Sequence, residues 1–464
     1  MGTISDKLMR VINTKEDIRR ALISKGYDVP TPIPFKEYAK MILDLPCKAD
    51  SFPDIEGIVA RYSALGLTNE QMAENPVWKD LTGNGHDLQM KNFAWKEGSG
   101  ISDVYPGFIL GDGVDDFAVT EKELNFEDTY TVYTAFIPFQ NDPARNMILC
   151  GKNDTKDFSI NYSGTHLNFK PSTGVNLAVR IDQFALLVCK RNKDITTIIN
   201  LSTGESRSLK SVEFISNPGL YYLWRNVFAT FHAKAAIAGQ TICNGYFSTD
   251  EDDEKVLNWY KKQYPWLFPD QAWTVTGKTN EDEDRATIAN ITGNGNDLVL
   301  SNFGFAEGSG YNEEGEYAGY LVTDGVDDSG RAVGLTISKD FTIVGEWVLF
   351  SETSENAGIA IYPQIHIFNR HDAIQIRFRG ADKTLPVKSL KAICSDGRCY
   401  DENWSELKIN VGEFTDNKGT LFVGSNGTNY AQIAFKNLGI YDNHILSKDE
   451  CIKAYNYLQT LKSK

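Results

Sequence analysis

The sequence lacks the features that define several large functional classes. It has 47 lysine and arginine residues against 62 aspartate and glutamate residues, a formal net charge of −15 at pH 7. Nucleic-acid binding depends on clustered basic side chains that release counterions from phosphates. No apolar run reaches the ~18 residues that a membrane-spanning helix needs. We therefore expect neither a nucleic-acid partner nor a membrane partner.

Targeting signals are also missing at the N-terminus. Charged residues are scattered through residues 1–20, where a secretion signal would need an apolar stretch of about 7 to 15 residues. Asp6 stands where an N-myristoylation motif needs serine or threonine. These observations predict assembly in a reducing cytoplasm.

Cysteine and histidine are too few and too irregularly spaced to indicate chemistry. The seven cysteines show no repeated spacing, which argues against a disulfide framework and against a zinc site. One local bridge between Cys394 and Cys399 stays open, although free thiols fit a reducing compartment better. The six histidines form no helical metal-ligand pair and no nucleophile motif. The sequence therefore predicts no catalytic residue, no metal ligand and no cofactor.

What the chain does contain is an internal repeat with a period near 210 residues. Four motifs recur in the same order: Thr68–Glu70 as Thr279–Glu281, Thr82–Gly85 as Thr292–Gly295, Glu97–Gly100 as Glu307–Gly310, and Asp112–Asp116 as Asp324–Asp328. This period is longer than the 20 to 50 residues of solenoid repeats, so each copy can be a whole domain. We place the copies at 49–268 and 269–464.

Within each copy, short apolar or alternating runs are separated by turn residues, which is typical of antiparallel strands. With 38 glycines and 12% aromatic residues, the composition also favours β-structure. We predict strands over 131–136, 186–188, 195–199 and 235–238, and over 341–350, 374–379, 407–411 and 432–435. Each copy should close on one helix, after capping boxes at Ser248 with Glu251 and at Ser447 with Glu450.

Residues 1–48 have a different pattern. Apolar residues at helical spacing predict short helices over 4–12, 18–25 and 35–45, which form a small α-helical unit. Such a unit is too small to enclose a core of its own. Its apolar face should therefore be covered by the following domain, by other copies of the chain, or by another protein.

Each copy resembles a laminin-G-like, concanavalin A-like jelly roll. The likeness is carried by Trp78–Gly85, by the Asp-Gly-Val-Asp-Asp motif, and by Gly439–Tyr441 followed by Leu446–Glu450. It implies a mainly β fold with two tandem antiparallel jelly-roll β-sandwiches after the helical unit. This family includes sugar binders, protein binders and spacers, so the resemblance predicts shape better than function.

The N-terminal segment resembles the opening segments of head and tail fibre proteins of gut bacteriophages, through Thr14–Arg19 and Ala21–Gly26. The resemblance implies a structural virion protein that attaches to other virion proteins through residues 1–48. A homo-oligomer, either a dimer or a trimer, is the usual form of such appendages. The sandwiches would then project toward a host surface or glycan. A bacterial surface carbohydrate-binding protein is the alternative, and a polysaccharide-degrading enzyme is a third.

The Asp-Gly-Val-Asp-Asp motif has two interpretations. Asp112, Asp115 and Asp116 offer the oxygen ligands that calcium prefers, and calcium often binds at the sandwich rim in the family that the chain resembles. A simpler interpretation is a turn in which Gly113 supplies the backbone angles and the carboxylates cap local amides. We favour the turn. Gly83-Asn84-Gly85 likewise predicts a tight turn, because the lysine of a phosphate-binding loop is missing.

Catalysis and sugar binding leave different marks in a jelly roll. Jelly-roll glycosidases carry a Glu-x-Asp-x-x-Glu pattern on one strand, and no strand-like segment here has it, so we expect no enzyme. A sugar site would use an exposed aromatic ring with nearby polar groups. The candidate rings are Trp95, Tyr221, Tyr222, Trp224, Tyr400 and Trp404. Phe305 replaces Trp95 in the second copy, which predicts a packing role at that position.

Overall fold

The computed structural model separates the chain into two units, Met1–Asp54 and Ile55–Lys464. The structure describes residues 52–139, 147–152, 158–163, 166–170, 177–180, 183–211, 219–225, 232–350, 358–362, 364–370, 373–387, 389–414, 418–425 and 429–463. The helices predicted within residues 1–48 lie outside the described residues, and so does Cys47.

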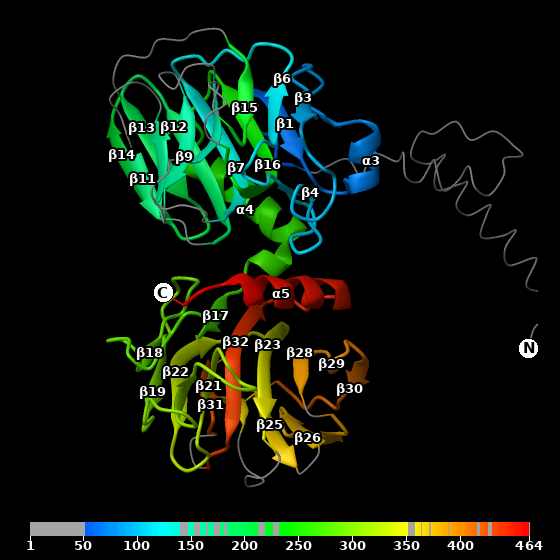
Figure 1. Cartoon of the computed structure of the whole chain (residues 1–464), viewed down its shortest axis with the longest axis vertical. Coiled ribbons are helices and arrows are strands. Elements are labelled where there is room, and N and C mark those ends of the chain that lie inside the picture. Colours follow the sequence, from blue (N-terminus) through cyan, green and yellow to red (C-terminus); the bar gives the residue numbers. More distant parts are fainter. Residues whose placement is uncertain are drawn as a thin grey trace, which may run out of the picture. The chain divides into compact units, whose positions relative to one another are not determined.

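The first sandwich has a back sheet, so named because a helix covers its outer face. Its eight strands are antiparallel, with the order β14-β13-β12-β7-β16-β5-β4, and β1 also pairs with β16 (Figure 1). The strands are β1 (Ile58–Ser63), β4 (Gly100–Ile101), β5 (Ile109–Leu110), β7 (Tyr130–Pro138), β12 (Ala185–Arg191), β13 (Ile195–Asn200), β14 (Glu205–Lys210) and β16 (Ala235–Asn244).

The front sheet of the first sandwich closes its core from the other side. Its order is β11-β10-β9-β8-β15-β6-β3-β2. The strands are β2 (Val77–Trp78), β3 (Leu88–Lys91), β6 (Phe117–Thr120), β8 (Met147–Lys152), β9 (Ser159–Ser163), β10 (His166–Lys170), β11 (Leu177–Arg180) and β15 (Tyr221–Leu223), and the short helix α3 (Asn69–Glu74) lies between β1 and β2 in the chain.

The second sandwich has the same two layers. Its back sheet runs β20-β21-β32-β23-β28-β29-β30 with β17 on β32, and its front sheet runs β18-β19-β22-β31-β24-β25-β26-β27. The back strands are β17 (Gln271–Thr274), β20 (Gly310–Asn312), β21 (Tyr320–Val322), β23 (Phe341–Leu349), β28 (Leu390–Cys394), β29 (Arg398–Asp401), β30 (Glu406–Lys408) and β32 (Ile433–Asp442). The front strands are β18 (Thr287–Ile288), β19 (Leu298–Ser301), β22 (Ser329–Thr336), β24 (Ile359–Tyr362), β25 (Ile365–Arg370), β26 (Ala373–Phe378), β27 (Ala381–Leu385) and β31 (Lys418–Val423).

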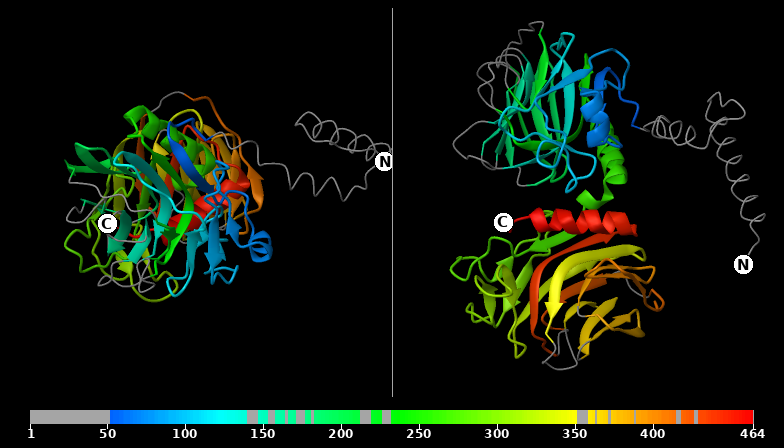
Figure 2. Two further views of the ribbon diagram at one scale, coloured as in Figure 1. Left: turned by 90° about the horizontal axis from the view of Figure 1, so that it is seen from above. Right: turned by 45° about the vertical axis from the view of Figure 1, so that its right-hand side comes forward.

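The two sandwiches are copies of one topology. The back sheet of each places its longest strand, β16 or β32, beside β7 or β23, and the outer strands follow in the same order. Figure 2 shows the paired layers of each sandwich. The predicted fold class, two tandem antiparallel β-sandwiches, is therefore confirmed, while the domain boundaries at 48/49 and 268/269 stay predictions.

One helix follows the last long strand of each sandwich, as the sequence predicts. Helix α5 (Lys448–Thr460) has the predicted capping box of Ser447 with Glu450. Helix α4 (Asp250–Gln263) begins one residue later than predicted, because Thr249 and Asp252 form its capping box. The Ser248 hydroxyl instead donates to Asp253. After α4 comes the 3₁₀ helix η1 (Pro265–Leu267). No helix among the described residues is long and apolar enough to cross a membrane.

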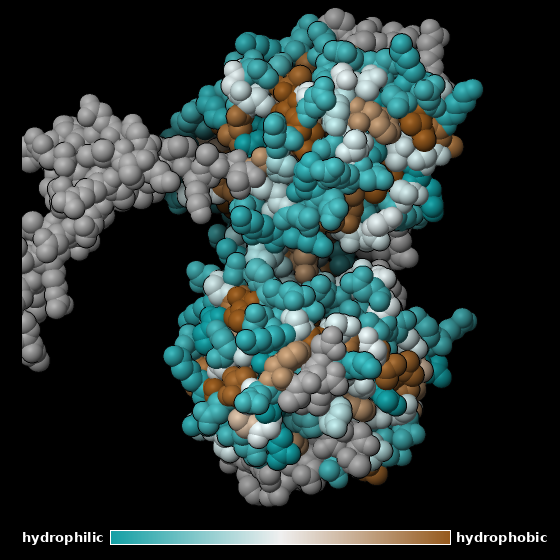
Figure 3. Space-filling model, turned by 180° about the vertical axis from the view of Figure 1, so that it is seen from behind, coloured by the Kyte–Doolittle hydropathy of each residue, from teal (hydrophilic) through white to brown (hydrophobic). Residues whose placement is uncertain are grey.

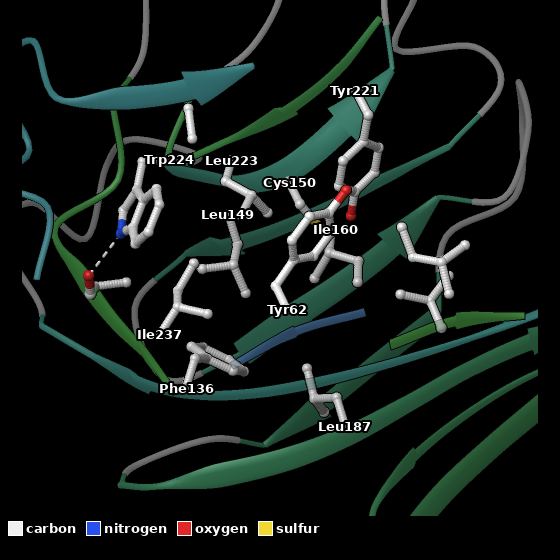
Figure 4. Packing of buried hydrophobic residues seen from close by; sticks show 14 of the residues in the cluster. Tyr62, Phe136, Leu149, Cys150, Ile160, Leu187, Tyr221, Leu223, Trp224 and Ile237 are labelled. Atoms are coloured by element: carbon white, nitrogen blue, oxygen red, sulfur yellow. Dashed lines mark hydrogen bonds between the residues drawn. The ribbon is translucent and has the colours of Figure 1, made fainter. Parts of the chain in front are cut away.

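Each sandwich encloses its own hydrophobic core. Phe136, Leu187 and Ile237 from the back sheet meet Leu149 and Ile160 from the front sheet in the first core (Figure 4). Strand β7 is buried along eight of its nine residues, because the core covers one face and α4 covers the other. This two-sided burial explains its continuous apolar and aromatic sequence.

Most predicted strands coincide with observed ones, and one does not. The segment predicted over 407–411 is a strand only to Lys408, where β30 ends. The Ile409 amide bonds to the Gly397 carbonyl outside the strand ladder. All cysteines other than Cys47 are buried free thiols. The alternative bridge between Cys394 and Cys399 is therefore absent from this structure.

Candidate functional site

In each sandwich, the closing helix covers the outer face of the back sheet. On the back sheet of the first sandwich, Tyr133 and Lys190 reach out to Asp253 of α4. On that of the second, Leu458 of α5 packs against Gly439, where a Cβ atom would approach to 3.1 Å. No helix among the described residues covers the front sheets. Functional side chains are therefore best sought on the outer faces of the front sheets.

On the face drawn in Figure 3, hydrophobic residues lie in separate patches between hydrophilic ones. Among the large ones, Val299, Val333 and Tyr362 share the front sheet of the second sandwich and are 51%, 52% and 56% exposed. Three exposed apolar groups on one sheet single out this face.

Strand alternation places an aromatic row on that face. In β24 and β25, isoleucines at 359, 361, 365 and 367 point into the core, so the residues between them point outward. The outward residues include Tyr362, His366 and Phe368, and Phe422 joins them from β31. We name Tyr362, His366, Phe368 and Phe422 the aromatic face.

The rings of the aromatic face lie close together. The centroid of His366 is 5.8 Å from those of both Tyr362 and Phe368. In the sheet, Phe422 pairs with Ala360, and Ala360 pairs with His366. Because Ala360 is small, the space above it between the two rings is not filled by its own side chain. Tyr362, His366 and Phe422 thus form one shallow platform across three adjacent strands, while Phe368, only 7% exposed, supports it from beside His366.

Arginines flank this platform at both ends. The Arg377 guanidinium lies 5.5 Å from the Phe368 ring and bonds to Asp382 at 2.8 Å. At the other end, the Arg331 guanidinium lies 5.6 Å from the Phe422 ring. Burial, together with the charge of Arg377, lowers the pKa of His366 below its usual 6.5. His366 is therefore a neutral ring at pH 7, able to stack and to exchange hydrogen bonds.

On the equivalent face of the first sandwich, the side chain of Arg225 lies over the aromatic rings. Tyr222 is the counterpart of Phe422 in the first copy. Each ring lies three residues before an isolated β-bridge, which is at Arg225 in the first copy and at Ser425 in the second. The Arg225 guanidinium lies 3.6 Å from the Phe117 ring and 5.2 Å from the Tyr222 ring. Ser425 has no side chain long enough to do the same. The two copies therefore differ in how far their front aromatics are accessible.

The acidic triads sit in turns that their own carboxylates hold. Asp112, Asp115 and Asp116 bring oxygens within 4.8 Å of one another, as do their counterparts in the second copy. Asp112 accepts from the amides of Val114 and Asp115 at 2.7 and 3.3 Å, and Asp116 accepts from the Asp112 amide at 2.9 Å. These contacts are the ones that the turn interpretation predicts.

The predicted sugar-binding rings are mostly unsuitable for that role. Tyr221, Trp224 and Tyr400 are fully buried, and Tyr222 is 9% exposed. Figure 4 shows why Trp224 is fixed: its indole N–H donates to the Ala235 carbonyl at 2.7 Å. Burial excludes these rings as platforms.

Trp95 and Trp404 are partly exposed but serve packing. Trp95 stacks on Phe93 with centroids 5.1 Å apart, and both Trp95 and its counterpart Phe305 pack against their cores. The predicted packing role at this position is confirmed. Trp404 lies edge-on to Tyr455 of α5 at 5.6 Å.

Sequence reasoning missed the aromatic face, although a signal for it is present. Ile-Ala-Ile-Tyr at 359–362 and Ile-His-Ile-Phe at 365–368 alternate strictly, with isoleucine on one side and larger or polar groups on the other. Tracing which side of each strand the isoleucines occupy would have marked Tyr362, His366 and Phe368 as outward.

No protein-family model matches the sequence, and the search of curated proteins found no match. Among solved structures, the chain is similar at 10% identity to a Trypanosoma rangeli sialidase in complex with sialic acid, with a TM-score of 0.33. That alignment covers 49% of this chain but 39% of the sialidase, so the chain spans about two fifths of that protein.

Two further structures align over more of the chain. HCR/D-Sa-GBL1/C is 10% identical over 83% of this chain and 94% of that one, with a TM-score of 0.37. The binding domain of Paraclostridial Mosquitocidal Protein 1 is 10% identical over 79% and 91%, with a TM-score of 0.33. Likenesses this distant say nothing about function, and the site must be judged by its own geometry.

Proposed function

We propose that the protein is a non-enzymatic glycan-binding protein whose ligand stacks on the aromatic face. The observation that carries the proposal is the outward row of rings around Tyr362, which is 56% exposed at the end of the central strand β24. Aromatic rings bind the apolar faces of sugar rings, and nearby polar groups fix the hydroxyls. Gln375 and Thr420 point outward beside the row and supply such groups.

The same face argues against an enzyme. Glycoside hydrolysis uses two carboxylates about 5 to 9 Å apart. Among the described outward residues of strands β22, β31, β24, β25, β26 and β27, the one carboxylate is that of Asp382, which is bound to Arg377. Binding without cleavage is the chemistry that this arrangement supports.

A virion appendage is the setting that we propose for this binding. The support is the resemblance of residues 14–26 to the opening segments of phage head and tail fibre proteins. A shallow platform makes few contacts with each ligand, and an appendage that repeats the site in a homo-oligomer gains avidity. Residues 1–48 would then hold the copies together or attach them to other virion proteins. A bacterial surface carbohydrate-binding protein remains the alternative.

The glycan-binding proposal is tested by removing the exposed ring. We expect Tyr362→Ala to weaken binding to host surface polysaccharide at least about tenfold, because the lost stacking surface is worth roughly 1.4 kcal/mol or more. Affinity electrophoresis of the full chain in gels that contain the polysaccharide measures this change.

Val326→Ala is the matched control, since Val326 is 72% exposed in a turn of the same sandwich. This variant should bind as the parent does, and both variants should melt at the parent temperature. Undiminished binding of a folded Tyr362→Ala protein would contradict the proposal. Mass spectrometry of purified phage particles tests the setting separately, because a virion protein must be present there.

A further inference from the structure

We propose that the glycan bound by the aromatic face is acidic and that Arg331 pairs with its carboxylate. This inference rests on the proposed function and adds the ligand class. It starts from a difference between the two arginines that flank the face, Arg331 on β22 and Arg377 on β26.

Arg377 is already neutralised. Its Nε bonds to Asp382 Oδ1 at 2.8 Å, and its Nη2 bonds to Asp382 Oδ2 at 3.3 Å. This two-point contact uses the donors that would otherwise hold an anion. Arg377 therefore shapes one end of the platform without offering it a free charge.

Arg331 has no such partner. Its side chain is exposed, and no carboxylate among the described residues forms an ion pair with it. In the sheet it stands directly beside Phe422 on one side and Val299 on the other. Because this guanidinium lies over the Phe422 ring, a sugar stacked on the neighbouring rings of the platform would meet it at the edge of Phe422. Arginine prefers a planar carboxylate, which it can hold with two parallel hydrogen bonds.

The charge of the face runs against that of the chain. Among the described outward side chains of β22, β31, β24, β25, β26 and β27, Arg331, Arg377 and Lys418 are positive and Asp382 is negative. The whole chain carries a net charge of −15. A locally positive face on an acidic protein favours anionic ligands, while the rest of the surface repels them.

Among its described residues, the first sandwich has no counterpart of Arg331 on its front sheet. Val119 pairs with Gln89 and Tyr222 and so occupies the place that Arg331 has between Val299 and Phe422. Among the described residues at this place, a valine replaces the arginine, and Tyr222 lies buried beneath Arg225. The predicted anionic site therefore belongs to the second sandwich.

The test compares acidic polysaccharides with their carboxyl-reduced forms. We would run the full chain in affinity gels that contain polygalacturonate, alginate or hyaluronate, and in gels that contain the reduced form of each. At low salt we expect at least one acidic polymer to bind more than about tenfold more tightly than its reduced form. Arg331→Gln should remove that preference, because a charge-assisted hydrogen bond is lost. Arg207→Gln is the control, since Arg207 is an exposed arginine on β14 of the first sandwich.

The outcomes separate the two proposals. Equal binding of acidic and reduced polymers, lost on Tyr362→Ala, would overturn the anionic ligand and leave glycan binding intact. Binding of neither form, with the protein folded, would contradict both. A preference for the acidic form that survives Arg331→Gln would overturn the role of Arg331.

Discussion

Asp116 has a buried carboxyl group whose ionised form is destabilised by burial. It is 1% exposed, and burial raises its pKa from 3.8 to about 6. The Asp112 amide donates to one of its oxygens, while its Oδ1 has no partner that meets hydrogen-bond geometry. Burial also raises the pKa of Asp328, its counterpart in the second copy. The turn thus holds a carboxyl that is more easily protonated in the folded state than in the unfolded one.

The sign of the resulting pH dependence follows from this shift. Because the folded-state pKa lies above the unfolded value of 3.8, the stabilisation from protonated Asp116 is complete below about pH 4 and is lost as the pH rises through about 6. Asp116→Asn keeps an acceptor for the Asp112 amide and removes the charge. We expect its free energy of unfolding at pH 8 to exceed that of the parent by roughly 1 to 3 kcal/mol, since one pKa unit corresponds to about 1.4 kcal/mol.

Urea unfolding at pH 4 and pH 8 measures this effect, and the advantage of Asp116→Asn should disappear at pH 4. Asp115→Asn is the control, because Asp115 lies exposed in the same turn. A constant difference at both pH values would show that the substitution acts through packing and not through the charge.

At the scale of the helix, the two copies solve one packing problem with different chemistry. Lys190 pairs with Thr131 in the sheet and donates to Asp253 of α4 at 2.8 Å. In the second copy, Cys394 pairs with Thr342 at the equivalent position. Its partner on the helix is Cys451, and both thiols approach the Leu446 carbonyl, at 3.8 and 4.0 Å. A buried ion pair attaches α4, and a pair of buried thiols attaches α5.

Lys190→Met should therefore be costly. It leaves Asp253 buried without its cation, and we expect the free energy of unfolding to fall by about 3 kcal/mol in urea titrations. Lys190→Met combined with Asp253→Leu should recover a large part of that loss, because no unpaired charge remains. If the double variant were less stable than the single one, the ion pair would be a net contributor that apolar packing cannot replace.

Turns were more readable in the sequence than strand faces. The repeated Thr-Gly-Asn-Gly motif requires positive φ at Gly83 and Gly85, 78° and 81°, and its Thr82 and Asn84 side chains bond to the Val59 carbonyl. Such local requirements leave a fixed signature. The aromatic face depends instead on which strands become neighbours, because Phe422 lies far along the chain from Tyr362 and meets it only through the pairing of β31 with β24.

For the whole molecule, the duplication could be predicted from the sequence because both copies kept their turn motifs. The structural difference between the two copies could not be predicted in this way. The loss of an open face in the first copy depends on Arg225, a single residue outside every repeated motif. Its effect needs the fold that brings Phe117 and Tyr222 together. Sequence comparison of the copies could align such positions but could not show that one side chain covers two rings.

Oligomeric state is a property of the full chain that residues 1–48 are predicted to control. We expect sedimentation equilibrium to give a dimer or trimer for residues 1–464 and a monomer for residues 49–464, since the outward face of the second sandwich is proposed for ligand and not for self-association. The truncated chain must unfold cooperatively at the parent melting temperature for the comparison to count. The same oligomer for both chains would show that residues 1–48 do not control the oligomeric state.

The thiol pair under α5 also allows the movement of this helix away from the sheet to be measured by chemical labelling. Cys394 and Cys451 are both fully buried, so a thiol-alkylating reagent reaches them when the helix lifts from the sheet. In the first copy the buried Cys243 thiol lies near Asp252 and Asp253 of α4, so its labelling must be mapped separately from that of Cys451. Peptide mapping of Cys451 labelling would therefore time the opening of one helix in a native chain that contains two.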